Sequence, residues 1–201
     1  MIAPPKPDPK PDPKPVCKPA SIALDTSEIS AAATSATEQL DDERYMREAL
    51  RLAAEAASRG DVPVGALVVL DGAIIGTGFN IREGRADPSG HAEIVALRDA
   101  CRSTQRWRVD GATLYVTLEP CPMCAGALVN ARVHRLVYGA DDPKAGAVRS
   151  LFQICDDPRL NHRMQVHPGV LAKSCSALLS DFFRAIRERR SAHRRPHLPT
   201  T

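Results

Sequence analysis

The chain has 201 residues, 43% of them hydrophobic, which is enough for one packed domain with flanking tails. Its formal net charge of +3 is mild, so charge alone neither requires nor excludes a nucleic-acid partner. No apolar run is long enough for a membrane-spanning helix, and the first residues lack a secretory apolar segment. The six cysteines show no disulfide framework, so we expect a reducing, cytoplasmic compartment.

The N-terminal part of the sequence, residues 1–38, has low complexity. A repeat of Pro, Lys and Asp is followed by a segment rich in Ser, Thr and Ala. Neither composition can bury a core, so we expect a disordered extension whose repeat is polyproline-like. One folded domain is expected over residues 39–190, followed by a basic tail over residues 191–201.

The first half of the domain shows a helical pattern followed by a hairpin pattern. Apolar residues at helical spacing predict a helix from Asp41 to Ser58. A strand over Val62–Leu70, a tight turn at Asp71-Gly72 and a strand over Ala73–Phe79 are expected next. Asn80 closes the hairpin, where it is either a turn residue or an amide contact for a substrate.

Helical and strand patterns then alternate. We expect a helix from His91 to about Arg102, a strand over Ala112–Leu118, a helix from about Pro122 to Ala131, and a strand over Arg135–Tyr138. A strand, a helix and a strand joined by a short crossover predict parallel neighbours, with helices covering the sheet.

The last third begins with a polar loop, Gly139 to Ala147. Ligands of α/β sheets bind beyond the carboxyl ends of strands, so this loop either faces a substrate or is an ordinary connection. A short helix is expected over Ser150–Cys155 and a last strand over Met164–His167. A closing helix over Leu171–Arg190 has a basic end, which either complements the helix dipole or contacts phosphate groups.

Two short motifs carry the chemistry, His91-x-Glu93 and Cys121-x-x-Cys124. Cysteines three residues apart share one face of a helix, and a helix N-terminus favours their thiolate form. One imidazole and two thiolates leave the fourth position of a zinc ion open. A catalytic zinc site has such an opening, whereas a structural site closes all four positions.

Glu93 lies two residues from His91, close enough to share the metal's water without binding the metal. Zinc lowers the pKa of a bound water towards about 7, and a positioned acid–base group typically contributes about 10²–10⁴-fold to the rate. The set suits hydrolytic replacement of an aromatic amine by oxygen. The H-x-E…P-C-x-x-C spacing is the known signature of zinc deaminases.

Each motif alone has a simpler interpretation. A single C-x-x-C is often half of a structural zinc knuckle or a redox pair, and a histidine at a helix start is often a cap. The chain has no second C-x-x-C to close a structural site, and Glu93 favours catalysis. A thioredoxin-like redox role lacks the surrounding pattern.

Beyond these motifs, the chain resembles the bacterial tRNA-specific adenosine deaminase family from about Asp41 to Arg187. The H-x-E…P-C-x-x-C core marks the whole deaminase superfamily, and the flanking segments are more specific to the tRNA enzymes. The matching segments are Val62–Ala66, Gly76–Asn80, Asp87–Glu93, Thr113–Ala127, Tyr138–Ser150, Asn161–Arg163 and Ala177–Arg184.

The resemblance implies a three-layer α/β/α fold of the cytidine deaminase type, with a five-stranded mixed sheet between helices. It implies a homodimer that converts the wobble adenosine in the anticodon stem-loop of an arginine tRNA to inosine. One Zn²⁺ per subunit would be held by His91, Cys121 and Cys124, with Glu93 as proton shuttle. The substrate-binding residues that it implies are Asn80, Asp142, Lys144, Phe182 and Phe183.

Two features depart from the family pattern: residues 1–38 have no counterpart in the family, and Asp141 puts a second carboxylate beside Asp142.

One alternative is a small-molecule deaminase of the same superfamily, acting on guanine, cytosine or a deoxynucleotide. The loop over Gly139–Ser150 and the aromatic closing helix favour RNA instead. A second alternative is a zinc-containing RNA-binding module without catalysis, and Glu93 argues against it.

Overall fold

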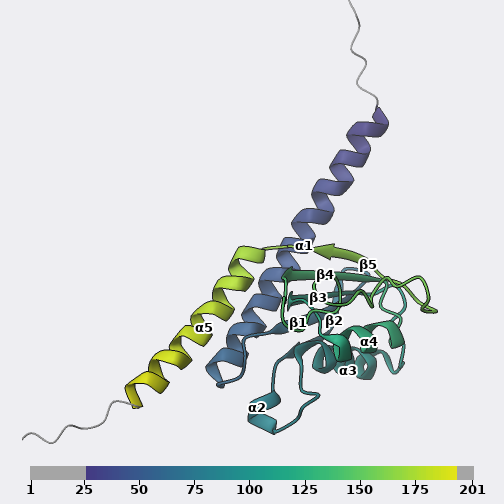
Figure 1. Ribbon diagram of the computed structural model, residues 1–201. Helices are drawn as coiled ribbons and strands as arrows, with labels where there is room; N and C mark the ends of the chain where they lie inside the picture. The colour runs from purple at the N-terminus through teal and green to yellow at the C-terminus, as the bar shows by residue number, and fades with distance from the viewer. Residues whose placement is uncertain (1–25, 194–201) are drawn as a thin grey trace, which may run out of the picture. The chain divides into compact units, whose positions relative to one another are not determined.

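The computed structural model describes the backbone of residues 26–193 and the side chains of residues 38–192. Five strands form one mixed sheet in the order β2-β1-β3-β4-β5 (Figure 1). β1 pairs antiparallel with β2 and β3, whereas β4 pairs parallel with β3 and β5. The strands are β1 (Gly65–Leu70), β2 (Ala73–Phe79), β3 (Thr113–Leu118), β4 (Arg135–Ala140) and β5 (Gln165–Pro168).

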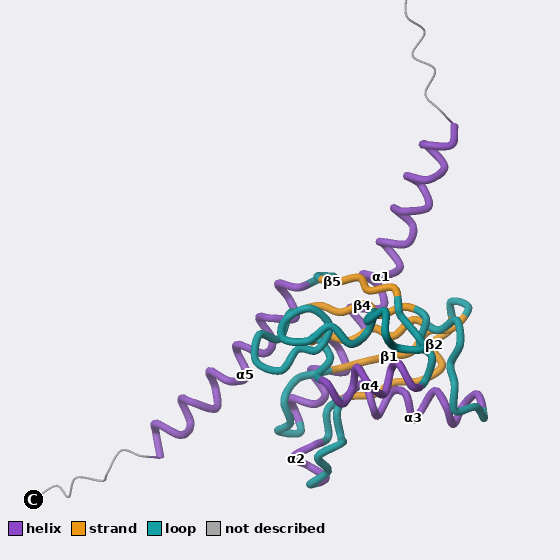
Figure 2. The backbone as a smooth tube through the Cα atoms, turned by 45° about the vertical axis from the view of Figure 1, so that its right-hand side comes forward, coloured by secondary structure: helices purple, strands orange, loops and turns teal. Residues whose placement is uncertain are grey.

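Helices cover both faces of this sheet. On one face lie α3 (Ala92–Thr104) and α4 (Pro122–Asn130), which run side by side in Figures 1 and 2. Their apolar side chains pack on those of β1, β3 and β4 in one buried cluster. The predicted α/β fold with a mixed sheet between helix layers is therefore confirmed.

The opposite face is covered by α5 (Ala172–His193) and by the part of α1 (Thr26–Ser58) that contains Tyr45, Met46, Ala49 and Leu52. Met46 of α1 and Cys175 of α5 belong to a second buried cluster, together with Leu67, Tyr115 and Val137 of the central strands. Of the described residues, 37–193 belong to one compact unit, and the helical residues 26–36 belong to another. No helix within residues 26–193 has the length and apolar character needed to cross a bilayer.

A largely buried ion pair between Arg135 and Asp42 joins α1 to the sheet. The guanidinium of Arg135 donates to both carboxylate oxygens of Asp42, at 2.7 and 2.6 Å. The Tyr115 hydroxyl donates to the same carboxylate at 2.8 Å. These contacts join the helix to β3 and β4 with a fixed register.

Two element boundaries differ from expectation near the N-terminus. α1 begins at Thr26 and not at Asp41, so residues 26–38 are helical where disorder was expected; residues 1–25 lie outside the described residues. The segment contains an alanine run, Ala31–Ala33, and alanine has the highest helix propensity. β1 begins at Gly65 and not at Val62, because Pro63 has no N–H for a strand ladder.

Two further differences concern the region around the predicted site. The prediction of a helix over Ser150–Cys155 was wrong, because this segment is a series of turns and bends. A four-residue helix, α2 (Arg82–Arg85), was not predicted. β4 continues past Tyr138 to Ala140, and the tail over residues 194–201 lies outside the described residues.

Candidate metal centre and substrate pocket

The predicted zinc ligands meet at the starts of two neighbouring helices. His91 immediately precedes α3, Cys121 immediately precedes α4, and Cys124 lies in the first turn of α4. The Sγ atoms of both cysteines are 3.6 Å from Nδ1 of His91. The three ligand atoms all lie within 4.8 Å of one another, so the fold brings together residues that are 30 positions apart in sequence.

This donor set fits zinc in chemistry and in spacing. Zinc binds thiolate sulfur at about 2.3 Å and imidazole nitrogen at about 2.1 Å, and a tetrahedral angle then separates sulfur from nitrogen by about 3.6 Å. The structure has 3.6 Å for both pairs. His91, Cys121 and Cys124 can therefore hold a zinc ion with one position left open, and no rearrangement is needed.

Hydrogen bonds among the three side chains shift their pKa values. A hydrogen bond from the Cys124 thiol lowers the pKa of Cys121 to about 4, and the same interaction raises the pKa of Cys124. The hydrogen bond with Cys121 raises the pKa of His91. Cys121 therefore favours the thiolate form, which is the form that binds a metal ion, whereas His91 and Cys124 would give up their protons when a metal ion binds.

Glu93 lies in the first turn of α3 and is not one of the gathered metal-ligand atoms. Its side chain is only 4% exposed. Burial raises its pKa to about 7, because a buried carboxylate loses the hydration of its charge. A carboxyl group that titrates near neutral pH can both accept and return a proton, which is what acid–base catalysis at that pH requires.

Beside these groups lies a cavity of about 200 Å³. This is smaller than the roughly 300–1,000 Å³ of sites for drug-sized ligands, so it suits a single base-sized group. The cavity is lined by Val62, Val64, Asn80, Arg82, His91, Ala92, Glu93, Leu118, Glu119, Cys121, Asp142 and Ala145.

Of the residues expected to bind substrate, Asn80 and Asp142 line this cavity. Asn80 is 6% exposed, and its Nδ2 donates to the Val62 carbonyl at 3.2 Å. Its side-chain oxygen is buried and has no hydrogen-bond partner within the described residues. A buried acceptor without a partner is costly, so this oxygen is available to an N–H donor that enters the pocket.

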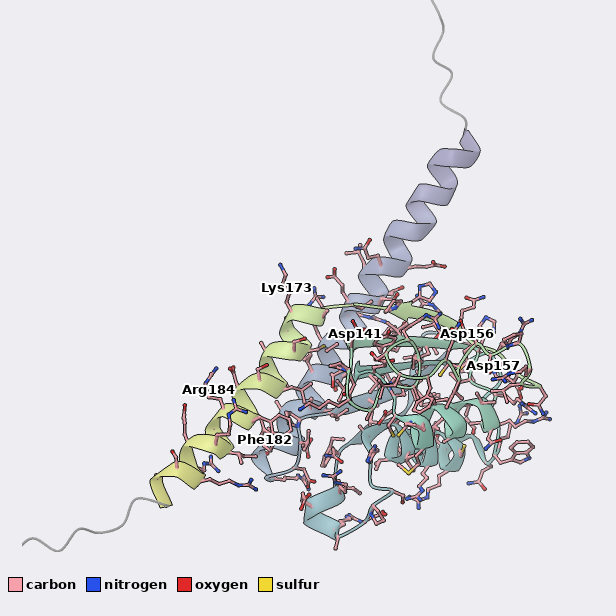
Figure 3. The ribbon with its side chains drawn as sticks, viewed as in Figure 1. Asp141, Asp156, Asp157, Lys173, Phe182 and Arg184 are labelled. Atoms are coloured by element: carbon pink, nitrogen blue, oxygen red, sulfur yellow. The ribbon has the colours of Figure 1, made fainter. Side chains whose placement is uncertain are left out.

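The other three residues expected to bind substrate lie outside the cavity lining. Lys144 is exposed on the loop after β4, where its backbone N–H donates to Asp142 Oδ1 at 2.9 Å. Phe182 and Phe183 are on α5, with their ring centroids 5.5 Å apart in an edge-to-face arrangement. Figure 3 shows Phe182 on α5. A role for these three residues would require a substrate that extends beyond the pocket.

The structure adds Arg82, which sequence reasoning missed. It is the first residue of α2 and lines the cavity. The buried carboxylate of Asp61 holds this helix by accepting the backbone N–H groups of Glu83 and Gly84, at 2.7 and 3.1 Å. Asp61 is only 2% exposed. The sequence offered two weak signals: Asp61 follows Gly60, which ends a helix, and Arg82 lies in a charged segment after Asn80.

Glu119, just before the cysteine motif, is the second residue that was missed. Its carboxylate accepts the backbone N–H groups of Asp142, Val148, Arg149 and Ser150, at 2.9, 3.0, 2.7 and 3.0 Å. The Ser150 hydroxyl donates to it as well. Burial by itself would raise the pKa of Glu119, but these hydrogen bonds outweigh it and lower the pKa to about 2.

Comparisons with known proteins agree with this site. The model of the MafB19-like deaminase family matches residues 40–187. A tRNA-specific adenosine deaminase of Bacillus subtilis (strain 168) is 46% identical over 154 residues, which are 77% of this chain and 96% of that protein.

Two solved structures share the fold. One, from biochemical and structural studies of A-to-I editing by tRNA:A34 deaminases, is 43% identical with a TM-score of 0.66 and covers 68% of this chain and 99% of its own. The other, a guanine deaminase from Nitrosomonas europaea, is 26% identical with a TM-score of 0.57 and covers 70% and 83%. The site and these likenesses lead to one conclusion: the chain belongs to the tRNA-specific adenosine deaminase family.

Proposed function

We propose that this protein deaminates adenosine at the wobble position, the first position of the anticodon, in tRNA. The reaction adds water to the base, forms inosine and releases ammonia. One observation carries the proposal. A three-ligand metal centre and a buried carboxylate share a base-sized pocket, in a chain 46% identical to a tRNA-specific adenosine deaminase.

His91, Cys121 and Cys124 would hold a zinc ion, which would supply Lewis acidity and lower the pKa of a water molecule. Glu93 would take one proton from the attacking water and give it to the ring nitrogen, and would then pass the second proton from the added hydroxyl to the departing amine. Its raised pKa, about 7, suits both transfers. The unpartnered oxygen of Asn80 accepts a hydrogen bond from the base and orients it.

An anticodon loop is a favourable source for the base. Bases in such a loop are partly unstacked, so turning one into a pocket costs less than extracting it from a duplex. The rest of the RNA then lies outside the small cavity. Arg82 at the pocket wall and the exposed Lys144 suit contacts with flanking phosphates, while Asp142 faces the nucleotide. Phe182 and Phe183 offer rings for contact with the loop further away.

The proposal includes an arginine tRNA as substrate, a homodimer and a cytoplasmic location. These follow from the family likeness together with the absence of a disulfide framework in the sequence. Sedimentation at micromolar concentration tests the dimer, and a stable monomer would contradict it.

The activity is tested with zinc-loaded protein and an arginine tRNA anticodon stem-loop. Inosine is measured at the wobble position, and free adenosine, guanine and cytosine are assayed in parallel. A stem-loop with the adenosine moved to the next anticodon position serves as control. Conversion of the wobble adenosine alone supports the proposal, and conversion of a free base alone refutes it.

Deamination of a free purine is the second candidate, favoured by the 26% identity to a guanine deaminase. The metal centre serves both reactions equally. The difference lies in Arg82 and Lys144, because a free base has no phosphate for them to contact. The same assay separates the two candidates.

A further inference from the structure

Glu119 occupies an unusual position between the metal centre and the substrate side of the pocket. It lies two residues before the ligand Cys121, and it lines the cavity. Yet its carboxylate points into the loop that follows β4, where four backbone N–H groups and one hydroxyl donate to it. The first and last of these donors are Asp142 and Ser150, which we use to define the β4–β5 loop as residues 142–150.

The β4–β5 loop is shaped around this carboxylate. Gly146 passes so close that a Cβ atom there would overlap Glu119 Oε2 and would lie 2.6 Å from the Asp142 carbonyl oxygen. Backbone hydrogen bonds continue the same arrangement, since Ala147 N–H donates to the Pro120 carbonyl at 2.8 Å. The loop is thus built on the segment that also carries the first cysteine ligand.

Within the loop, Asp142 and Ala145 form part of the cavity wall. Asp142 Oδ1 accepts the N–H groups of Lys144 and Ala145, at 2.9 and 3.2 Å. These hydrogen bonds fix the part of the loop that forms the cavity wall. The reacting groups, by contrast, lie at the starts of α3 and α4.

We propose that Glu119 is a positioning residue: its buried carboxylate holds the β4–β5 loop as the substrate-binding wall of the pocket. Within residues 38–192, the hydrogen bonds of the Glu119 carboxylate go to the β4–β5 loop and not to His91, Cys121, Cys124 or Glu93. Its loss should then weaken binding of the nucleotide more than the chemical step. The catalytic part of this inference depends on the proposed function, whereas its structural part does not.

The test uses the zinc-loaded full chain with Glu119→Gln, which keeps the size of the side chain but places an NH₂ group among N–H donors. Amide hydrogen exchange is followed over residues 142–150, and zinc content is measured. Steady-state deamination of the anticodon stem-loop gives KM and kcat separately. Glu48→Gln is the matched control, because the Glu48 carboxylate on α1 accepts hydrogen bonds from the exposed Arg51 and does not line the cavity.

We expect faster exchange at Val148, Arg149 and Ser150, unchanged zinc content, a KM raised about tenfold and a kcat changed by less than about threefold. The control should match the wild type in each respect. Unchanged exchange overturns the proposal whatever the activity. Loss of zinc, or a fall in kcat at unchanged KM, also overturns it, because Glu119 would then support the metal-binding turn.

Gly146→Ala is a second variant that disturbs the same contact from the loop side. Its methyl group must displace the carboxylate of Glu119, while residues 119–121 keep their sequence. It should reproduce the faster exchange and the raised KM. Wild-type exchange and KM in the Gly146→Ala variant would contradict the proposal even if Glu119→Gln failed to fold. A wild-type protein inactive on RNA would refute the proposed function and leave the exchange result to decide the role of Glu119.

Discussion

The pocket has two walls that are built in different ways. The catalytic wall consists of His91, Glu93, Cys121 and Cys124, at the starts of α3 and α4. Its members are two or three residues apart within each motif, so helix geometry places them. The substrate wall consists of α2, which has only four residues, and the β4–β5 loop, which contains no helix or strand.

Two buried carboxylates hold the substrate wall. Asp61 accepts the N–H groups of α2 over 22 and 23 residues of sequence, and Glu119 accepts those of the β4–β5 loop over 23 to 31 residues. Charge-assisted bonds to backbone N–H groups are about twice as strong as neutral ones, so short irregular segments become fixed. We therefore expect substitutions at Asp61 and Glu119 to change substrate binding, and substitutions in the catalytic wall to change the chemical step.

The largest expected effect is on the catalytic wall, from Glu93→Gln. The variant keeps the size of the buried side chain but cannot move protons, so kcat should fall by about 10²–10⁴-fold. KM for the stem-loop and zinc content should stay near wild type, because Glu93 is not among the gathered ligand atoms. Steady-state deamination of the stem-loop gives kcat and KM, and metal analysis gives the zinc content. Retention of the wild-type rate would refute the catalytic role.

Metal removal gives the next effect, measured as thiol alkylation at pH 8 with and without a chelator. Cys121 should be protected by zinc and react once it is removed, because its pKa in the metal-free site is about 4, whereas the buried Cys124, whose pKa is raised, should react more slowly. Cys155 and Cys175 should stay unreactive in both states, because burial raises their pKa to about 12 and about 11. Only the thiolate reacts, so roughly a thousandth of Cys175 is reactive at pH 8.

The sign of the pH dependence follows. Labelling of Cys175 should increase as the pH rises towards 11, and Cys155 should follow at a higher pH. Zinc should not alter either rate, since neither thiol is among the gathered ligands. Equal protection of all the thiols by zinc would show that the metal stabilises the whole core and not one site.

The same contrast explains what could be predicted from the sequence. The helix starts at His91 and Cys121, and the strand between them, follow from short-range signals: apolar spacing, turn residues and ligand spacing. Their bounds in the structure differ from expectation by at most two residues. The meeting of His91, Cys121 and Cys124 was likewise foreseeable, because one imidazole and two thiols at this spacing match a known motif.

The errors arose where the deciding contact is distant in sequence or was given too little weight. Residues 150–155 do not form a helix, because the N–H of Ile154, which a helix would direct to the Ser150 carbonyl, donates to the Ala147 carbonyl at 3.0 Å. The roles of Arg82 and Asp61 could not be predicted from the residues around them in the sequence. Only the fold shows that Arg82 lines the cavity and that Asp61 accepts N–H groups of α2. The early start of α1 had a local cause, the alanine run at Ala31–Ala33. This segment was expected to be disordered because its composition cannot form a core, although alanine strongly favours a helix.

A smaller effect should separate two arginines of α2. Arg82 lines the cavity, whereas Arg85, on the same helix, does not. Arg82→Gln should raise KM for the stem-loop about five- to tenfold and reduce the salt dependence of binding by about 0.7 in the log–log slope, the value for one phosphate contact in a single strand. Arg85→Gln is the matched control and should change neither. Equal effects would mean that α2 acts only through its overall charge.

The smallest effect should come from beneath this helix, at Asp61. Asp61→Asn keeps one acceptor oxygen but loses the negative charge that binds two N–H groups of α2, so Arg82 should become less well placed. We expect KM to rise about threefold with kcat unchanged. In the double variant with Arg82→Gln, the Asp61 change should add almost nothing, because its effect acts through Arg82. Full additivity in this double-mutant cycle would show that Asp61 supports the pocket by another route, and the substrate wall would then need a different explanation on its α2 side.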